Sequence, residues 1–101
     1  MSDYEKLLLD ALWFQAEKYL SHFGALKSHM LSSDEAGAAF GVVTFDVMLK
    51  AQTTERGTLS GLKRLREHGK VLSYQSRKGG MYRWWPVGFT EAKKNGGGKC
   101  D

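Results

Sequence analysis

The stretch that decides the fold is Arg56-Gly-Thr-Leu-Ser-Gly-Leu-Lys-Arg-Leu-Arg-Glu-His-Gly-Lys-Val-Leu-Ser-Tyr-Gln-Ser-Arg-Lys-Gly-Gly-Met-Tyr-Arg-Trp-Trp85. Its first half predicts a helix over residues 54–68, because leucines recur every three residues and a glycine then ends the pattern. Its second half predicts a two-stranded hairpin over residues 72–85. We expect this hairpin to turn at Lys78-Gly79-Gly80, where glycine adopts a positive φ at little cost.

Basic residues are concentrated in the same stretch. Between Arg56 and Arg83 there are eight Lys or Arg residues against one acid, Glu67, for a net charge of +7. All five arginines of the chain lie in this interval, and the guanidinium group suits phosphate and guanine better than an ammonium group does. Residues 1–55, by contrast, carry four Lys against eight Asp or Glu, a net charge of −4. The basic half predicts contact with a polyanion, and the alternative is a solvated basic surface.

Length and composition restrict the class of protein. The 101 residues, 42% of them hydrophobic, support one small domain with one core. No run of eighteen apolar residues is present to span a membrane, and the acidic N-terminal segment is unlike a secretion signal. The one cysteine, Cys100, has no partner for an internal disulfide, which fits a reducing compartment. We therefore expect a cytoplasmic, nucleoid-associated protein with no membrane partner.

The N-terminal segment, residues 1–31, is expected to be helical. Residues 3–23 are rich in Leu, Ala, Glu and Lys and contain no Gly or Pro, and Ser2 or Asp3 can cap the helix that they predict. Residues 25–31 can continue it for two further turns.

The remaining segments are shorter. We expect a short helix and a brief strand between residues 35 and 43, followed by a second helix from Thr44 to about Ala51. Residues 91–101 lack the apolar content to pack and are expected to be disordered. The single domain is therefore expected to span residues 1–90.

The order of a helix, a tight turn, a second helix and a hairpin is that of a winged helix-turn-helix. Residues 62–71, Leu-Lys-Arg-Leu-Arg-Glu-His-Gly-Lys-Val, resemble the L-x-x-L-x-x-x-G-x-V/I joint of winged-helix transcriptional regulators. The wing end Gly80-Met-Tyr-Arg-Trp-Trp85 resembles small regulators of bacterial fimbrial operons. The resemblance covers residues 44–85 and implies a mostly α fold with a small β-hairpin (α+β). Two glycines inside the recognition helix and the long aromatic helix before the motif depart from the commonest pattern.

This resemblance implies a small prokaryotic or phage transcriptional regulator that binds double-stranded DNA. Helix 54–68 would read the major groove, and hairpin 72–85 would contact the backbone or the minor groove. With Leu62 at the centre of the buried face, Arg64 points outward and is the best candidate for a bidentate contact with guanine. The two helix glycines allow close approach either to DNA or to the preceding helix, and we prefer the DNA interpretation. The expected DNA-contacting residues are Thr53, Thr54, Arg56, Gly57, Ser60, Gly61, Lys63, Arg64, Lys70, Arg77 and Lys78.

Helix 3–23 carries apolar residues on two faces, and a core this small is expected to cover only one of them. One face consists of Leu8, Leu12, Tyr19 and Phe23, which we expect to pack on the domain's own core. The other face is expected to form a homodimer with a second copy. It consists of Leu9, Trp13, Ala16 and Leu20. The alternative is a monomer in which residues 25–43 fold back over the second face.

The sequence contains no pattern typical of an enzyme or a metal site. Its three histidines are scattered, and HExxH, CxxC, GxSxG and phosphate-loop patterns are absent. We expect no catalytic activity, no metal and no cofactor. The alternative function keeps the winged helix but uses it as a protein-interaction module that binds an acidic surface, for instance on another DNA-associated protein. A third possibility is RNA or non-specific nucleic-acid binding through the same basic surface.

Overall fold

Helices make up most of the fold, and a small antiparallel sheet joins them. The computed structural model describes residues 1–96. Its helical segments are α1 (Asp3–Phe23), η1 (Gly24–Leu26, a 3-10 turn), α2 (Lys27–Met30), α3 (Asp34–Ala39), α4 (Thr44–Ala51), α5 (Glu55–Glu67) and α6 (Phe89–Gly96). Its strands are β1 (Val42–Val43), β2 (Val71–Tyr74) and β3 (Arg83–Pro86), in the order β1-β3-β2. The prediction of a mostly α, α+β fold with a long N-terminal helix is confirmed.

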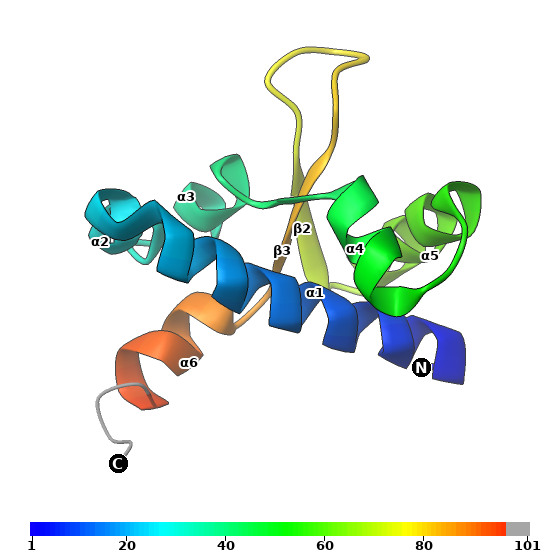
Figure 1. Cartoon of the computed structure of the whole chain (residues 1–101), viewed down its shortest axis with the longest axis horizontal. Coiled ribbons are helices and arrows are strands. Elements are labelled where there is room, and N and C mark those ends of the chain that lie inside the picture. Colours follow the sequence, from blue (N-terminus) through cyan, green and yellow to red (C-terminus); the bar gives the residue numbers. More distant parts are fainter. Residues whose placement is uncertain (97–101) are drawn as a thin grey trace.

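Helix α1 begins at a capping box. The Ser2 hydroxyl accepts a hydrogen bond from the Glu5 backbone N–H at 3.1 Å, and the Glu5 carboxylate accepts one from the Ser2 backbone nitrogen at 3.2 Å. From there α1 crosses the whole molecule, with α4 and α5 at its N-terminal end and α2 at its C-terminal end (Figure 1). None of the helices within residues 1–96 has the length and apolar character needed to cross a membrane.

Strand β3 lies at the centre of the sheet and carries two buried tryptophans. Leu72 pairs with Trp85 and Ser73 with Trp84. Neighbouring side chains of a strand point to opposite faces of the sheet, so Trp84 and Trp85 fill different halves of the core. Neither tryptophan has any exposed surface. Tyr74, the last residue of β2, is 39% exposed.

Each of these two tryptophans donates a hydrogen bond from its ring nitrogen to a threonine hydroxyl. Trp84 Nε1 donates to Thr44 Oγ1 at 2.8 Å, at the start of α4. Trp85 Nε1 donates to Thr90 Oγ1 at 3.4 Å in α6, and its ring lies so close to Gly37 of α3 that a Cβ there would be 2.3 Å from the ring. The sheet is therefore covered by α3 and α6 on the Trp85 face.

Helix α6 corrects the expectation of a disordered tail over residues 91–101. Phe89, with no exposed surface, packs 4.9 Å from the Trp85 ring and 5.0 Å from the Trp13 ring, measured between centroids. The Asp34 carboxylate accepts hydrogen bonds from the backbone N–H groups of Gly88 and Thr90, at the start of α6. The buried Phe89 ring and the Asp34 carboxylate thus hold a polar segment as a helix as far as residue 96. Residues 97–101 lie outside the described part of the chain.

The second apolar face of α1 is covered by the chain itself. Ala16 is fully buried and Leu20 is 5% exposed, while Leu9 and Trp13 are half-buried against the core. Ala16 and Leu20, two of the residues expected on the dimer face, therefore belong to the core, whereas Leu9 and Trp13 keep part of their surface exposed. Dimerisation through α1 stays a prediction.

Candidate nucleic-acid interface

The helix expected to read DNA, α5, has one face in the core and one in solvent. Thr54 caps it by accepting the Gly57 backbone N–H at 3.0 Å. The buried face consists of Thr58, Gly61, Leu62 and Leu65. The solvent face carries Glu55, Arg56, Ser60, Lys63 and Glu67, all exposed except the half-buried Lys63.

Gly57 and Gly61 do not face solvent, which corrects their place among the DNA-contacting residues. A Cβ at Gly61 would lie 2.3 Å from Leu8 Cδ1, and a Cβ at Gly57 would lie 2.6 Å from the hydroxyl of Tyr4. Both neighbours belong to α1. The glycines therefore let the first helix approach α5 closely, and neither DNA nor α4 is the reason for them.

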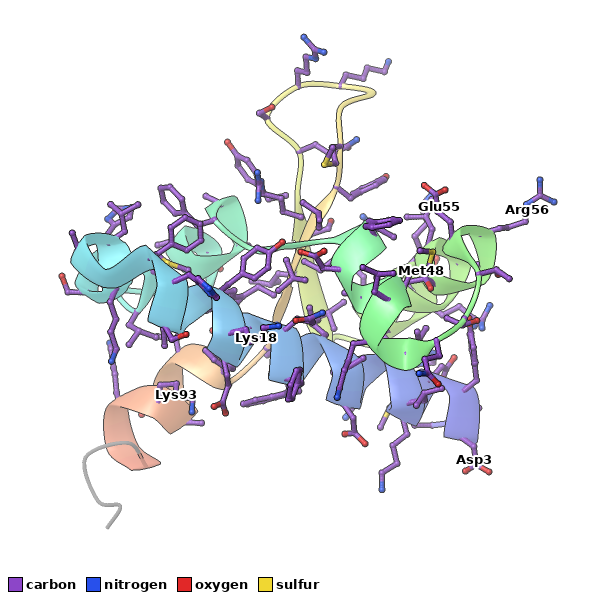
Figure 2. All side chains as sticks on the ribbon, in the orientation of Figure 1. Asp3, Lys18, Met48, Glu55, Arg56 and Lys93 are labelled. Carbon is purple, nitrogen blue, oxygen red and sulfur yellow. The ribbon has the colours of Figure 1, made fainter. Side chains whose placement is uncertain are left out.

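Because α1 packs against Gly57 and Gly61, α5 is turned about its own axis relative to the orientation that the sequence predicts. The buried face is centred between Leu62 and Gly61, roughly 50° from Leu62 at 100° per residue. The outward direction consequently moves from Arg64 toward Arg56 and Lys63. Figure 2 shows Arg56 projecting away from the body of the molecule at the outer end of α5.

Arg64 is held by α1. Its Nε donates to the Glu5 carboxylate at 3.1 Å and its Nη1 donates to the Ser60 hydroxyl at 3.1 Å. The Arg64 side chain is 48% exposed and that of Glu5 is 11% exposed. The backbone donor at Ser2 and the Arg64 guanidinium hold the pKa of Glu5 below its ordinary value. Glu5 thus stays ionised and keeps the arginine pointed along the side of α5.

Three other expected residues are engaged or displaced. The Thr53 hydroxyl is hydrogen-bonded to the Tyr4 hydroxyl at 3.0 Å, and the Thr54 hydroxyl serves as the helix cap. Lys70 precedes β2 at the base of the hairpin, where it lines a small pocket with Glu5. The hairpin tip lies at the opposite end (Figure 1). Lys70 therefore does not belong to the surface formed by α5 and the hairpin tip.

The hairpin tip, or wing, projects from the helical body (Figure 1). Arg77 and Lys78 lie at the tip and are exposed. The turn is closed by the Gly80 N–H donating to the Arg77 carbonyl at 2.9 Å, and Gly79 adopts a φ of 78°. Within residues 1–96, neither Arg77 nor Lys78 forms an ion pair.

Tyr82, which is not among the expected DNA-contacting residues, joins the wing to α5. Its ring stacks on Trp84 with a centroid distance of 5.1 Å. The Lys63 ammonium lies 5.4 Å from the ring centroid and the Arg66 guanidinium 5.7 Å. Arg66 also donates to the Ser73 hydroxyl at 2.7 Å, and its stem lies over the core. Tyr82 and Trp84 are two residues apart in an extended segment and therefore share a face, and this alternation is the signal that the sequence offers.

The described residues contain no group of three or more His, Cys, Asp or Glu side chains that could hold a metal ion. Comparisons of the chain with protein-family models, with curated proteins and with solved structures found no match.

Proposed function

We propose that this chain is a winged helix-turn-helix protein that binds double-stranded DNA as a small transcriptional regulator. The observation that carries the proposal is a set of cations on two neighbouring outward surfaces, α5 and the wing, which form no ion pair within residues 1–96. The set consists of Arg56, Lys63, Arg77 and Lys78. The sheet order β1-β3-β2, with α4 and α5 between β1 and β2, supports the winged-helix assignment.

In this arrangement α5 enters the major groove with its outward face. Arg56 replaces Arg64 as the best candidate for contact with a base edge, because it is exposed near the helix N-terminus and forms no ion pair within residues 1–96. Arg64, fixed by Glu5, presents its remaining nitrogen sideways and suits a phosphate. The wing cations Arg77 and Lys78 suit the backbone or a narrow minor groove.

The acids Glu55 and Glu67 stand on the same face of α5. Their carboxylates repel phosphates and lower the affinity for any DNA. Tight binding therefore requires a DNA sequence that offers these carboxylates a hydrogen-bond donor, such as cytosine N4. The proposal therefore favours a sequence-selective protein over a general DNA coat.

The salt dependence of binding tests the proposal. Four phosphate-facing cations, Lys63, Arg64, Arg77 and Lys78, predict that log K falls with log salt at a slope of about −3.6 on duplex DNA. Fluorescence anisotropy with a labelled random duplex at several salt concentrations measures this slope. Arg77→Ala with Lys78→Ala should reduce its magnitude by about 2. The matched control, Lys18→Ala with Lys27→Ala, removes two exposed lysines from the other end of the molecule and should change the slope little. No binding at low salt, or a slope that the control alters as much as the wing variant does, would reject DNA as the ligand.

Selection of a site from a random duplex pool then separates base from phosphate contacts. Arg56→Ala should cost about 1–3 kcal/mol and relax the preference at one base pair, whereas Lys63→Ala should weaken all sequences alike. Uniform weakening by Arg56→Ala would show that α5 does not read bases through this residue.

A further inference from the structure

The outward side of α4 carries apolar side chains. Phe45 and Leu49 are four residues apart, which places them one turn apart on the same side of the helix. Each of them is 54% exposed, so no segment of residues 1–96 covers them. A single exposed apolar residue needs no explanation, but a pair that adjoins further exposed apolar side chains does.

These further side chains line a groove between the wing and the starts of α4 and α5. The groove has a volume of about 640 Å³, and its apolar lining includes Phe45, Leu59, Met81 and Tyr82. Met81 is 70% exposed, while Leu59 and Tyr82 are half-buried. An exposed apolar patch with polar residues around it marks a site where another protein or a ligand binds.

Lysines surround this patch. Lys78 lines the groove on the wing, and Lys50 is exposed on α4. The Lys63 ammonium lies 5.4 Å from the centroid of the Tyr82 ring, which itself lines the groove. Within residues 1–96 none of the three lysines forms an ion pair, and Glu55 is the one acid among the lining residues. The occupant that these charges favour has apolar side chains for the patch and carboxylates beside them.

The backbone beside the groove is already paired. The β1–β3 register places Thr44 opposite Tyr82. The Gly80 N–H donates to the Arg77 carbonyl at 2.9 Å, and the Gly80 carbonyl accepts from Gln75 Nε2 at 2.7 Å. An extended peptide therefore finds no free edge to which it could add a strand. A helix pairs its backbone groups internally and binds through its side chains, so it needs no such edge.

Two other occupants fit the groove less well. A second copy offers the outward side of α1, where Leu7 and Phe14 are 46% and 47% exposed. More than half of each residue is thus already packed within its own chain, and a contact between two different surfaces builds rings or open filaments rather than a two-fold dimer. DNA supplies negative charge, but its apolar groups in the grooves are chiefly the thymine methyls. A helix of another protein supplies both the charge and the apolar side chains.

We infer that this groove binds an amphipathic, acidic helix of a partner protein. Apolar side chains three or four positions apart on that helix pack on Leu49, Phe45 and Met81. Acidic side chains beside them lie toward Lys50 at one end and toward Lys78 at the other. Because the groove lies between α5 and the wing, the bound helix keeps DNA from contacting both surfaces at once, a consequence that rests on the proposed function.

The test begins with a phage-displayed library of single helices, panned on the full chain. Each helix has an alanine-rich scaffold of about 18 residues, or roughly five turns, and is randomised along one side. We expect the enriched sequences to carry apolar residues at intervals of three or four positions with Asp or Glu beside them. One of them is synthesised with a fluorophore and titrated by anisotropy. A copy with proline at its centre should bind at least about tenfold more weakly, because proline breaks the helix.

Two matched chain variants locate the apolar part of the site. Phe45→Ala with Met81→Ala removes exposed apolar side chains of the groove and should weaken the peptide at least about tenfold. Leu7→Ala with Leu26→Ala removes two exposed apolar side chains elsewhere and should leave the affinity unchanged. All four residues are exposed, and thermal unfolding checks that both variants remain folded.

A second matched pair tests the charges. Lys50→Glu with Lys78→Glu should weaken the peptide at least about tenfold at low salt, because two attractions become repulsions. Lys27→Glu with Lys94→Glu reverses two exposed lysines on α2 and α6 and should change the affinity little. A peptide copy with Lys in place of its Asp and Glu should bind the Lys50→Glu, Lys78→Glu variant more tightly than it binds the wild type.

Any of four results would overturn the inference. The first is that no sequence both apolar and acidic is enriched. The second is that the proline copy binds as tightly as the parent peptide, and the third is that the groove or charge variant binds as tightly as its control. The fourth is sedimentation evidence that the wild type self-associates and that Phe45→Ala with Met81→Ala dissociates it, which would make a second copy the occupant. These measurements contain no DNA, so their failure and that of the proposed DNA binding are seen separately.

Discussion

Gly61→Ala should destabilise the protein, although the same change inside an ordinary helix stabilises it. Alanine at an exposed helix interior gains about 1 kcal/mol over glycine. At Gly61, however, the added Cβ would lie 2.3 Å from Leu8 Cδ1, and Leu8 has no exposed surface into which it can move. Overpacking of a closed core costs about 1–3 kcal/mol, and so short a contact places the cost at the upper end. The expected net loss is about 1–2 kcal/mol, or roughly 4–8 °C in Tm for each kcal/mol.

A double-mutant cycle with Leu8→Ala isolates the contact. Leu8→Ala alone should cost about 2–5 kcal/mol, because it leaves a cavity against α5. In that background Gly61→Ala has room for its methyl group and should become stabilising by about 1 kcal/mol. Urea unfolding of the four proteins, followed by circular dichroism, gives the coupling energy. If Gly61→Ala stabilises the wild type, or if the two changes are additive, α1 does not lie on α5 as described.

Three further changes probe other contacts. Thr44→Val removes the acceptor of the buried Trp84 Nε1 and should cost about 1–3 kcal/mol in urea unfolding; no change would mean that this bond contributes little. The pKa of Glu5 is lowered by folding, so its contribution to stability is complete above its ordinary value of 4.5 and is lost as pH falls through the lowered one. Glu5→Gln should therefore flatten the acid limb of the stability curve, and an identical limb would contradict the ion pair. Phe89→Ala should cost about 3–5 kcal/mol and shift Trp13 fluorescence to longer wavelength, whereas an unshifted spectrum would place α6 elsewhere.

The elements of residues 44–85 follow from local sequence. Thr54 marks the start of α5 because its hydroxyl caps the helix wherever the helix lies. The hairpin register follows from the glycine turn, since the pairing of Leu72 with Trp85 is fixed once residues 78–80 reverse the chain. Both signals act over a few residues, which is why they can be read without tertiary information.

The local sequence does not show in the same way which side of α5 faces the core. Three leucines at intervals of three define an apolar side only broadly, and the true buried face includes Thr58 and Gly61, which no hydropathy pattern marks. That face depends on where α1 lies, and this is set by residues about fifty positions earlier in the chain. The same limit applies to α6. The polar composition around Lys93 and Lys94 predicts disorder, whereas contacts of Asp34 and Phe89 hold the segment as a helix.

The central position of β3 has a consequence for synthesis on the ribosome. The strand that joins β1 to β2 is the last of the three to be made, and both tryptophans that fill the core belong to it. Until residue 86 has emerged, the apolar residues of α1 have no sheet to pack against and β1 has no partner. The apolar residues of α1 therefore stay exposed on the nascent chain until β3 has emerged, and transiently exposed apolar surface of this kind promotes aggregation.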